Sequence, residues 1–296
     1  MKLSLRSPSV VTVLAVLVLA SCGPSKNGGG EEESANSTVL PDSVQDVIKR
    51  LISELPSPHE IPYMLQATGA EFNQNLLNNR KKADDYLTRN DKAALNLGVY
   101  VADIGYQSSY DKTQEAIDYL NAVKMLADNL GVMGFDPEML SRIESNISNK
   151  DSLATLIDQA IKKTNMYLVD GARSKLAVMI ITGSFTEGLY ISTGLVKSYP
   201  KDLLPDDQRN LILTPMIRVI LDQEASVDKL VELLGYLDQS EPIAAILADL
   251  KTLKASYKAL NINEQIKNNK ANLVLSSKNL EEITRIVDKL RTFITD

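Results

Sequence analysis

Apolar residues recur at intervals of three and four along most of the chain, and no stretch of strand length alternates cleanly between apolar and polar positions. This is the spacing of one face of an α-helix. A first amphipathic helix is predicted around residues 44–55, followed by a loop at 56–62 whose three prolines cannot continue it. A polar helix is then expected at about 65–89, and an unusually apolar one at about 92–110.

Capping residues mark where later helices begin and end. Asp111, with Gln114 three positions on, fits a capping box, and Gly131 suits the left-handed position after a helix. Asp136-Pro137 has the preferences of a helix start. The remaining predictions are a helix opened by Asp151 or Ser152, one over 206–239 with a kink or break at Pro215, one over 242–260, a loop or short helix at 261–272, and a last helix at 278–295.

The stretch from Ala172 to Ser198 is apolar on nearly all sides. A helix without a polar face is usually buried in the middle of a domain. Polar residues such as Thr182 and Glu187 and three glycines interrupt the run, which argues against a membrane span. We therefore expect an all-α fold with this helix in its core, made of antiparallel helical hairpins packed as a multi-helix bundle or a short superhelix.

The N-terminus carries Lys2 and Arg6, and then an apolar run over residues 10–20 that is too short to span a bilayer, which takes about 20 helical residues. This pattern is typical of a secretory signal. The residues Leu19-Ala20-Ser21-Cys22 at its end resemble the lipobox of bacterial lipoproteins. The resemblance implies that a signal peptide (1–21) is cut before Cys22, whose sulfur then carries a diacylglyceryl group and whose amine carries a further acyl chain such as palmitate.

Cys22 is the only cysteine in the chain, so no internal disulfide can explain it. The alternative is an ordinary secretory signal with a chance cysteine. Residues 22–40 are rich in Gly, Ser, Asn and Glu, and are predicted to form a flexible tether before a helical domain at 41–296. Gly23, in place of an aspartate, implies outer-membrane delivery in such lipoproteins. The acidic run at 31–33 resembles the surface-export tags of Bacteroidetes lipoproteins, and the alternative is a solvated linker. The sequence therefore does not decide whether the domain lies on the periplasmic or the outer side of the membrane.

Charge and motifs exclude several classes of function. Without Lys2 and Arg6, 30 basic residues face 38 acidic ones, a net charge of −8, which offers no electrostatic footprint for nucleic acid. The single histidine, His59, lies in the proline-rich loop without a second histidine or any further cysteine nearby, so we expect no metal site. No nucleophile elbow, dinucleotide fingerprint or phosphate loop occurs. We expect no cofactor and no enzymatic activity.

Two short segments echo each other inside apolar helices: Asp103-Ile104-Gly105-Tyr106 and Glu187-Gly188-Leu189-Tyr190. Two explanations are open: a chance match, which is common for so short a segment, or duplication of a helical hairpin. Residues 96–132, together with the segment around Glu187, resemble all-helical lipoproteins of Bacteroidetes that have no assigned function. That resemblance transfers no catalytic residue.

The two acids of the echo define the candidate site, because a carboxylate in apolar helical surroundings is costly unless it is paired or hydrogen-bonded. Three interpretations stay open: a satisfied structural contact, a pocket for a small polar ligand, or a glycosidase-like pair of acids, which needs carboxyls about 5–9.5 Å apart. The pocket would be lined by Tyr100, Asp103, Tyr106, Tyr110, Glu187 and Tyr190.

The tether and the lack of catalytic motifs favour a lipid-anchored, non-enzymatic interaction or scaffolding module of the cell envelope. It would be held on the membrane through acyl chains on Cys22 and would bind an envelope protein partner. The alternative is a solute- or glycan-binding lipoprotein that uses the tyrosine and acid pocket. Glycan sites favour aromatic platforms, however, and this chain has no Trp and four Phe.

Overall fold

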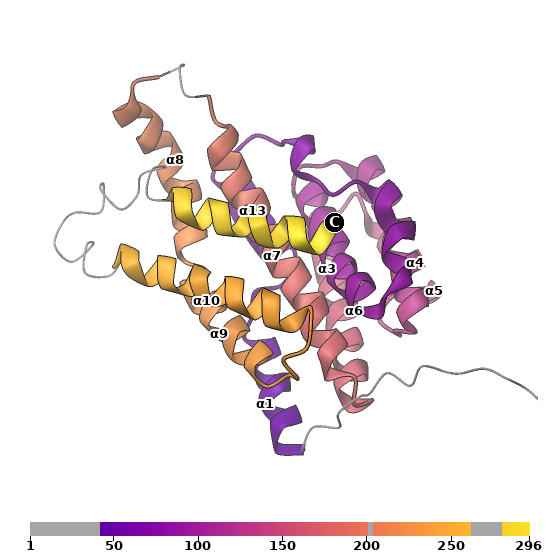
Figure 1. Ribbon diagram of the computed structural model, residues 1–296. Helices are drawn as coiled ribbons and strands as arrows, with labels where there is room; N and C mark the ends of the chain where they lie inside the picture. Colours follow the sequence, from indigo (N-terminus) through magenta and orange to yellow (C-terminus); the bar gives the residue numbers. More distant parts are fainter. Residues whose placement is uncertain (1–41, 201–203, 262–279) are drawn as a thin grey trace, which may run out of the picture. The chain divides into compact units, whose positions relative to one another are not determined.

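The computed structural model describes residues 42–200, 204–261 and 280–296, all of which belong to one compact unit spanning residues 37–296. Every regular element in these ranges is a helix and none is a strand, which confirms the predicted all-α fold (Figure 1). The predicted signal peptide, Cys22, the predicted tether and nearly all of the 261–272 stretch lie outside the described residues. In chain order the elements are α1 (Asp42–Ser53), α2 (Glu60–Ala67), the 3₁₀ helices η1 (Gln74–Leu76) and η2 (Arg80–Thr88), α3 (Asn90–Ser109), α4 (Thr113–Leu130), α5 (Pro137–Asn146), α6 (Lys150–Asp170), α7 (Ser174–Ser198), α8 (Asp206–Leu221), α9 (Glu224–Gly235), α10 (Ile243–Leu260) and α13 (Glu281–Thr295).

The polar helix expected at 65–89 is wrong. In its place α2 ends at Ala67, and two 3₁₀ helices follow after Gly69, whose φ is +81°. The side chains of Asn73 and Asn79 each accept a hydrogen bond from the backbone two residues on, 3.0 Å in both cases, and thereby start η1 and η2. Such local side-chain bonds compete with helical backbone bonds. Pro62 lies within the first turn of α2, where no backbone donor is needed, so the proline loop is shorter than predicted.

Some predicted caps are confirmed and others are wrong. The Asp136 carboxylate accepts from the Met139 amide (3.0 Å), and Gly131 adopts the left-handed conformation after α4. Asp111 does not cap α4, because its own φ is +60° and the helix begins after Lys112. The α6 cap is Asn149, upstream of the predicted positions.

The break expected within residues 206–239 does not fall at Pro215. Instead, α8 continues past Pro215, and the break falls at residues 222–223, between α8 and α9. The helices on either side of this junction pack as separate elements: α8 contacts α7 and α2, whereas α9 pairs chiefly with α10.

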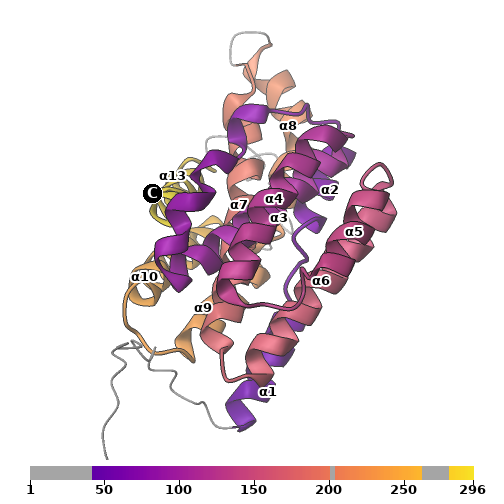
Figure 2. The ribbon, with the colours of Figure 1, turned by 90° about the vertical axis from the view of Figure 1, so that its right-hand side faces the viewer.

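The apolar helix α7 lies at the centre of the described domain, in contact with α2, α3, α6, α8 and α13 (Figures 1 and 2). By length and composition it could cross a membrane, but nearly all of its apolar stretch is buried in the domain. The structure thus gives α7 the core position that its sequence predicts.

The closest helix pair is α3 and α7, which are not neighbours in sequence. A Cβ atom on Gly98 would clash with the backbone carbonyl of Ile180, and one on Gly183 would clash with the carbonyl of Leu95. The two backbones therefore touch at a reciprocal pair of glycines. Both helices run in the same direction from this crossing, which brings the later turns of α3 against the later turns of α7 and positions the two acids of the echo.

Candidate functional site

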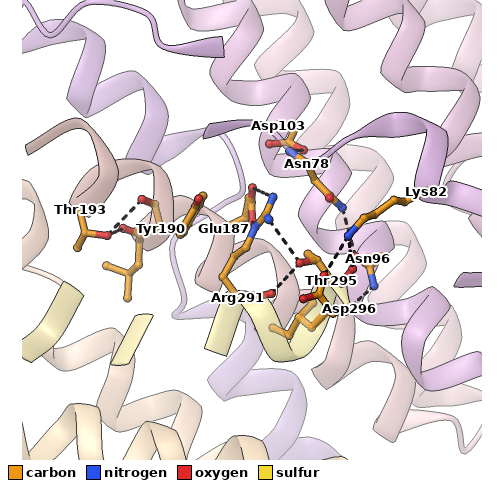
Figure 3. Close-up of polar contacts among 12 residues, drawn as sticks. Asn78, Lys82, Asn96, Asp103, Glu187, Tyr190, Thr193, Arg291, Thr295 and Asp296 are labelled. Atoms are coloured by element: carbon orange, nitrogen blue, oxygen red, sulfur yellow. Dashed lines mark hydrogen bonds and ion pairs between the residues drawn. The ribbon is translucent and has the colours of Figure 1, made fainter. Parts of the chain in front are cut away.

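The structure brings the two predicted acids together in the core. Asp103 on α3 and Glu187 on α7 lie near each other (Figure 3). Neither has exposed surface, and each shifts the pKa of the other. Tyr100 and Tyr106 are fully buried as well, and Tyr110 and Tyr190 are partly buried. The predicted residues therefore do lie together, but they are enclosed by the domain and do not line an open pocket.

Arg291 on α13 completes the cluster, and the sequence analysis missed it. Its Nε donates to Glu187 Oε2 at 3.2 Å and its Nη2 to Oε1 at 3.4 Å. The guanidinium lies 4.7 Å from the ring centroid of Tyr190, a favourable cation–π distance. One signal was available: a buried carboxylate requires a cation or several donors, and Arg291 lies at the edge of an apolar helix face, beside Val287 and Leu290.

Asp103 and Glu187 share the site in different protonation states. Burial, and then the negative charge of Glu187, raise the pKa of Asp103 well above its ordinary value. Burial also raises the pKa of Glu187, but the charge and hydrogen bonds of Arg291 oppose that shift. The arrangement favours a neutral Asp103 beside an ionised Glu187 that pairs with Arg291. Asp103 Oδ2 accepts from the backbone amide of Asn78 (3.2 Å). A side-chain hydrogen bond between the two carboxyl groups acts on both: it raises the pKa of Asp103 and lowers that of Glu187.

The tyrosines of the cluster are used for packing. Tyr100 donates its hydroxyl proton to the carbonyl of Asn79 (3.0 Å), and the Tyr106 hydroxyl accepts from the amide of Asn73 (2.8 Å). The Tyr106 ring also stacks on Phe72 at 4.9 Å between centroids. These contacts tie the irregular segment before η2 to α3, and they leave no ring face open as a platform for a sugar.

Neither Asp103 nor Glu187 has surface that solvent reaches in the described part of the chain. The cavity beside His59 and the larger one at the end of α7 are both lined by residues other than Asp103 and Glu187. Because neither carboxyl is exposed, the geometry favours the structural interpretation of the two acids over a ligand pocket and over a glycosidase-like pair, which needs room for substrate and water. Among the described residues, no three His, Cys, Asp or Glu side chains lie close enough to hold a metal ion.

His59 has a partner that the sequence did not suggest. Its Nδ1 lies 3.1 Å from Asp158 Oδ1 on α6, and also 3.1 Å from Ser57 Oγ. A catalytic triad needs the serine on one ring nitrogen and the acid on the other, so two partners on the same nitrogen do not make one. The adjoining cavity, about 10 Å³, has room for about one water molecule. His59 here joins the start of α2 to α6.

A larger cavity of about 420 Å³ lies between the end of α7, α8 and the start of α13. Aliphatic side chains form part of its lining, and seven polar or aromatic side chains form the rest: Lys197, Tyr199, Arg209, Glu281, Thr284, Arg285 and Asp288. On α8, Leu211 and Ile212 have 76% and 46% of their surfaces exposed, but they are not among the lining residues. We call the exposed pair Leu211 and Ile212 the α8 face. One signal could have predicted it: three consecutive aliphatic residues in a helix cannot all point to the inner side. The aliphatic lining residues are Val196, Leu213 and Leu280.

No protein-family model, curated protein sequence or solved structure matches this chain. The inference about function therefore depends on the geometry of the α8 face and the buried cluster, together with the N-terminal sequence.

Proposed function

We propose that this protein is a lipid-anchored, non-enzymatic interaction module of the cell envelope, and that it binds a protein partner through the α8 face. The observation that carries the proposal is the exposed aliphatic pair Leu211 and Ile212 at consecutive positions of α8. Exposed apolar surface is a common mark of protein docking. The lipobox resemblance at Cys22 supplies the anchor, and outer-membrane delivery is part of the same proposal.

The position of the α8 face suits a partner rather than the anchoring membrane. Lys49 on α1 pairs with Asp170, just before α7 begins, at 2.6 Å. The α8 helix follows the other end of α7, about 37 Å away for a helix of 25 residues. Figures 1 and 2 show α1 and the first turn of α8 toward opposite ends of α7. Since the tether precedes α1, an anchored domain would be able to present the α8 face away from the bilayer.

Charged side chains line much of the cavity of about 420 Å³, so it does not supply an apolar pocket for the partner. Lys197 pairs with Asp288 (2.8 Å), and Arg285 pairs with Glu282 (2.7 Å), so these ions largely satisfy one another. Sites for small solutes usually offer convergent polar groups that fix the ligand's orientation. A cavity with this mixed lining fits the alternative function, binding of a small polar solute, whereas the exposed pair on α8 offers a place for an apolar anchor from a protein.

The test is a site-specific photocrosslink in cells that express the full chain. A photoreactive residue at position 211 is compared with one at Met133, which is also exposed (53%) but lies before α5. We expect a discrete adduct at position 211, none at position 133, and loss of the adduct when Ile212 is changed to Asp. Equal adducts at both positions, or none at position 211, would contradict docking at the α8 face.

A further inference from the structure

The helix α13 is bound through a continuous apolar ridge on one side. The ridge residues recur at helical spacing and are at most 2% exposed, whereas Phe293 on the outer side is 44% exposed. The ridge packs on α7, α10 and α3. Residues 262–279 join α13 to α10. A cut in that segment would therefore leave α13 held by its contacts alone. The ridge consists of Ile283, Ile286, Val287, Leu290 and Ile294.

The last turn of α13 meets a set of donors from η2 and α3. Asn96 Nδ2 donates to the carbonyl of Ile294 (2.9 Å), and the Tyr86 hydroxyl and Lys82 Nζ donate to that of Thr295 (2.9 and 3.1 Å). Figure 3 shows Lys82 and Asn96 gathered at this end of the helix. The last carbonyls of a helix lack intrahelical partners and carry partial negative charge, so amide and ammonium donors are the groups that recognise them.

Two of these donors, Tyr86 and Asn96, are oriented by a residue outside α13. The side-chain nitrogen Nδ2 of Asn78 donates to the Tyr86 hydroxyl (3.3 Å) and to Asn96 Oδ1 (3.4 Å). The backbone carbonyl of Asn78 accepts from the Tyr119 hydroxyl (2.6 Å). The glycine crossing likewise fixes α3 against α7, and thereby positions Glu187. Among the described residues, Arg291 is the cation that pairs with Glu187. The surface under α13 thus has a fixed carboxylate and fixed donors that match one kind of ligand.

We propose that η2, α3 and α7 form a preformed receptor for the C-terminal end of an amphipathic helix, that α13 occupies it as an intramolecular ligand, and that a separate helix of the α13 pattern can take its place. The pattern is an aliphatic ridge, an arginine at the edge of the ridge, and a last turn whose carbonyls face the donors. This is recognition of a helix in a groove. It depends on neither the lipid anchor nor the α8 face.

The test uses the full chain with a protease site inserted between residues 262 and 279. After cleavage, a fluorescent peptide of residues 278–296 is added, and its binding is followed by anisotropy while mass spectrometry records release of the original fragment. We expect the peptide to bind the cut chain and to displace the fragment. The uncut chain should bind it far more weakly, because tethered α13 competes at high effective concentration.

Two peptide variants separate specific recognition from apolar association. Arg291→Ala should weaken binding by at least about tenfold, since it leaves Glu187 buried without its cation. Arg285→Ala is the matched control, because Arg285 pairs with Glu282 on its own helix, and it should stay within about twofold. Changing Glu187 to Gln in the receptor should remove most of the difference between the native and Arg291→Ala peptides.

Three outcomes would overturn the proposal. The original fragment fails to exchange, the cut chain loses its circular-dichroism signal for helix when the fragment leaves, or all three peptides bind equally well. The first would make α13 a permanent part of the core, the second would show that the receptor is not preformed, and the third would show that binding is only apolar.

Discussion

At the scale of single residues, the core of this domain encloses the carboxyl groups of Asp103 and Glu187 completely and most of the Arg291 side chain. Glu187 has no exposed surface, and 16% of the Arg291 side chain is exposed. Ionised groups in such a place are tolerated only when partners are supplied. Arg291 and Asn78 supply them here, and burial keeps a proton on Asp103.

Asp103→Asn should stabilise the fold at neutral pH. The pKa of Asp103 is raised in the folded state, so its contribution to stability is fully present below the unfolded pKa of 3.8 and is lost as pH rises toward the folded pKa. Asparagine is neutral at every pH and can still accept from the Asn78 amide. We expect the free energy of unfolding in urea to rise by on the order of 1 kcal/mol at pH 7, with little change near pH 4. Equal destabilisation at both pH values would contradict a protonated Asp103.

Arg291→Ala should destabilise the domain by about 3–5 kcal/mol, because it leaves the Glu187 charge buried without its cation. Replacing Glu187 and Arg291 together by methionine should recover much of that loss. Lys289 is the control: it pairs with Asp249 but its side chain is 62% exposed, so Lys289→Ala should cost at most about 1 kcal/mol. Urea denaturation measures all three variants, and similar losses for Arg291→Ala and Lys289→Ala would refute the role of burial.

At the scale of elements, the crossing of α3 and α7 is the contact that organises the core. It depends on two glycines, 85 positions apart, at which no side chain fits. The sequence shows glycines inside both apolar helices, but it does not show that these two helices meet. Local periodicity records which face of a helix is apolar and leaves its partner open.

Gly98→Ala and Gly183→Ala should each lower stability by at least about 2 kcal/mol, although alanine is the better helix former by about 1 kcal/mol. The reason is the clash of each new methyl group with a backbone carbonyl, which forces the helices apart. Gly235→Ala is the matched control, since a methyl group there would meet no other atom within 4 Å, and it should leave stability unchanged or slightly raised. Melting temperatures of the three variants test this; equal shifts at Gly98 and Gly235 would exclude a steric origin.

Helix boundaries were predictable where the signal is chemical and local. Asp136 followed by proline begins α5 as expected, and Gly131 ends α4 in the left-handed conformation. The segment between α2 and α3 was not predictable in this way. Asn73 and Asn79 form local caps there, and Tyr106 and Tyr100 from α3 hold the irregular backbone that results.

At the scale of the whole molecule, the proposed lipid anchor on Cys22 makes a direct prediction. Cys22→Ala should move the protein from the membrane fraction to the soluble fraction, because acyl chains then no longer hold it on the bilayer. Fractionation of cells, together with metabolic labelling by palmitate, measures the change; Ser21→Ala is the neighbouring control and should keep the label. A Cys22→Ala variant that stays with membranes would remove the lipid anchor from the proposed function.

The sequence by itself determined the helical class, the burial of α7 and several helix ends, because periodicity and capping are properties of a few adjacent residues. It also pointed to Asp103 and Glu187 as groups in need of partners. Only the tertiary structure decided that Arg291, 104 positions from Glu187, is that partner, and that the acids are enclosed while Leu211 and Ile212 are exposed. Those outcomes depend on which helices pack together, and contacts between distant segments leave no mark in local spacing.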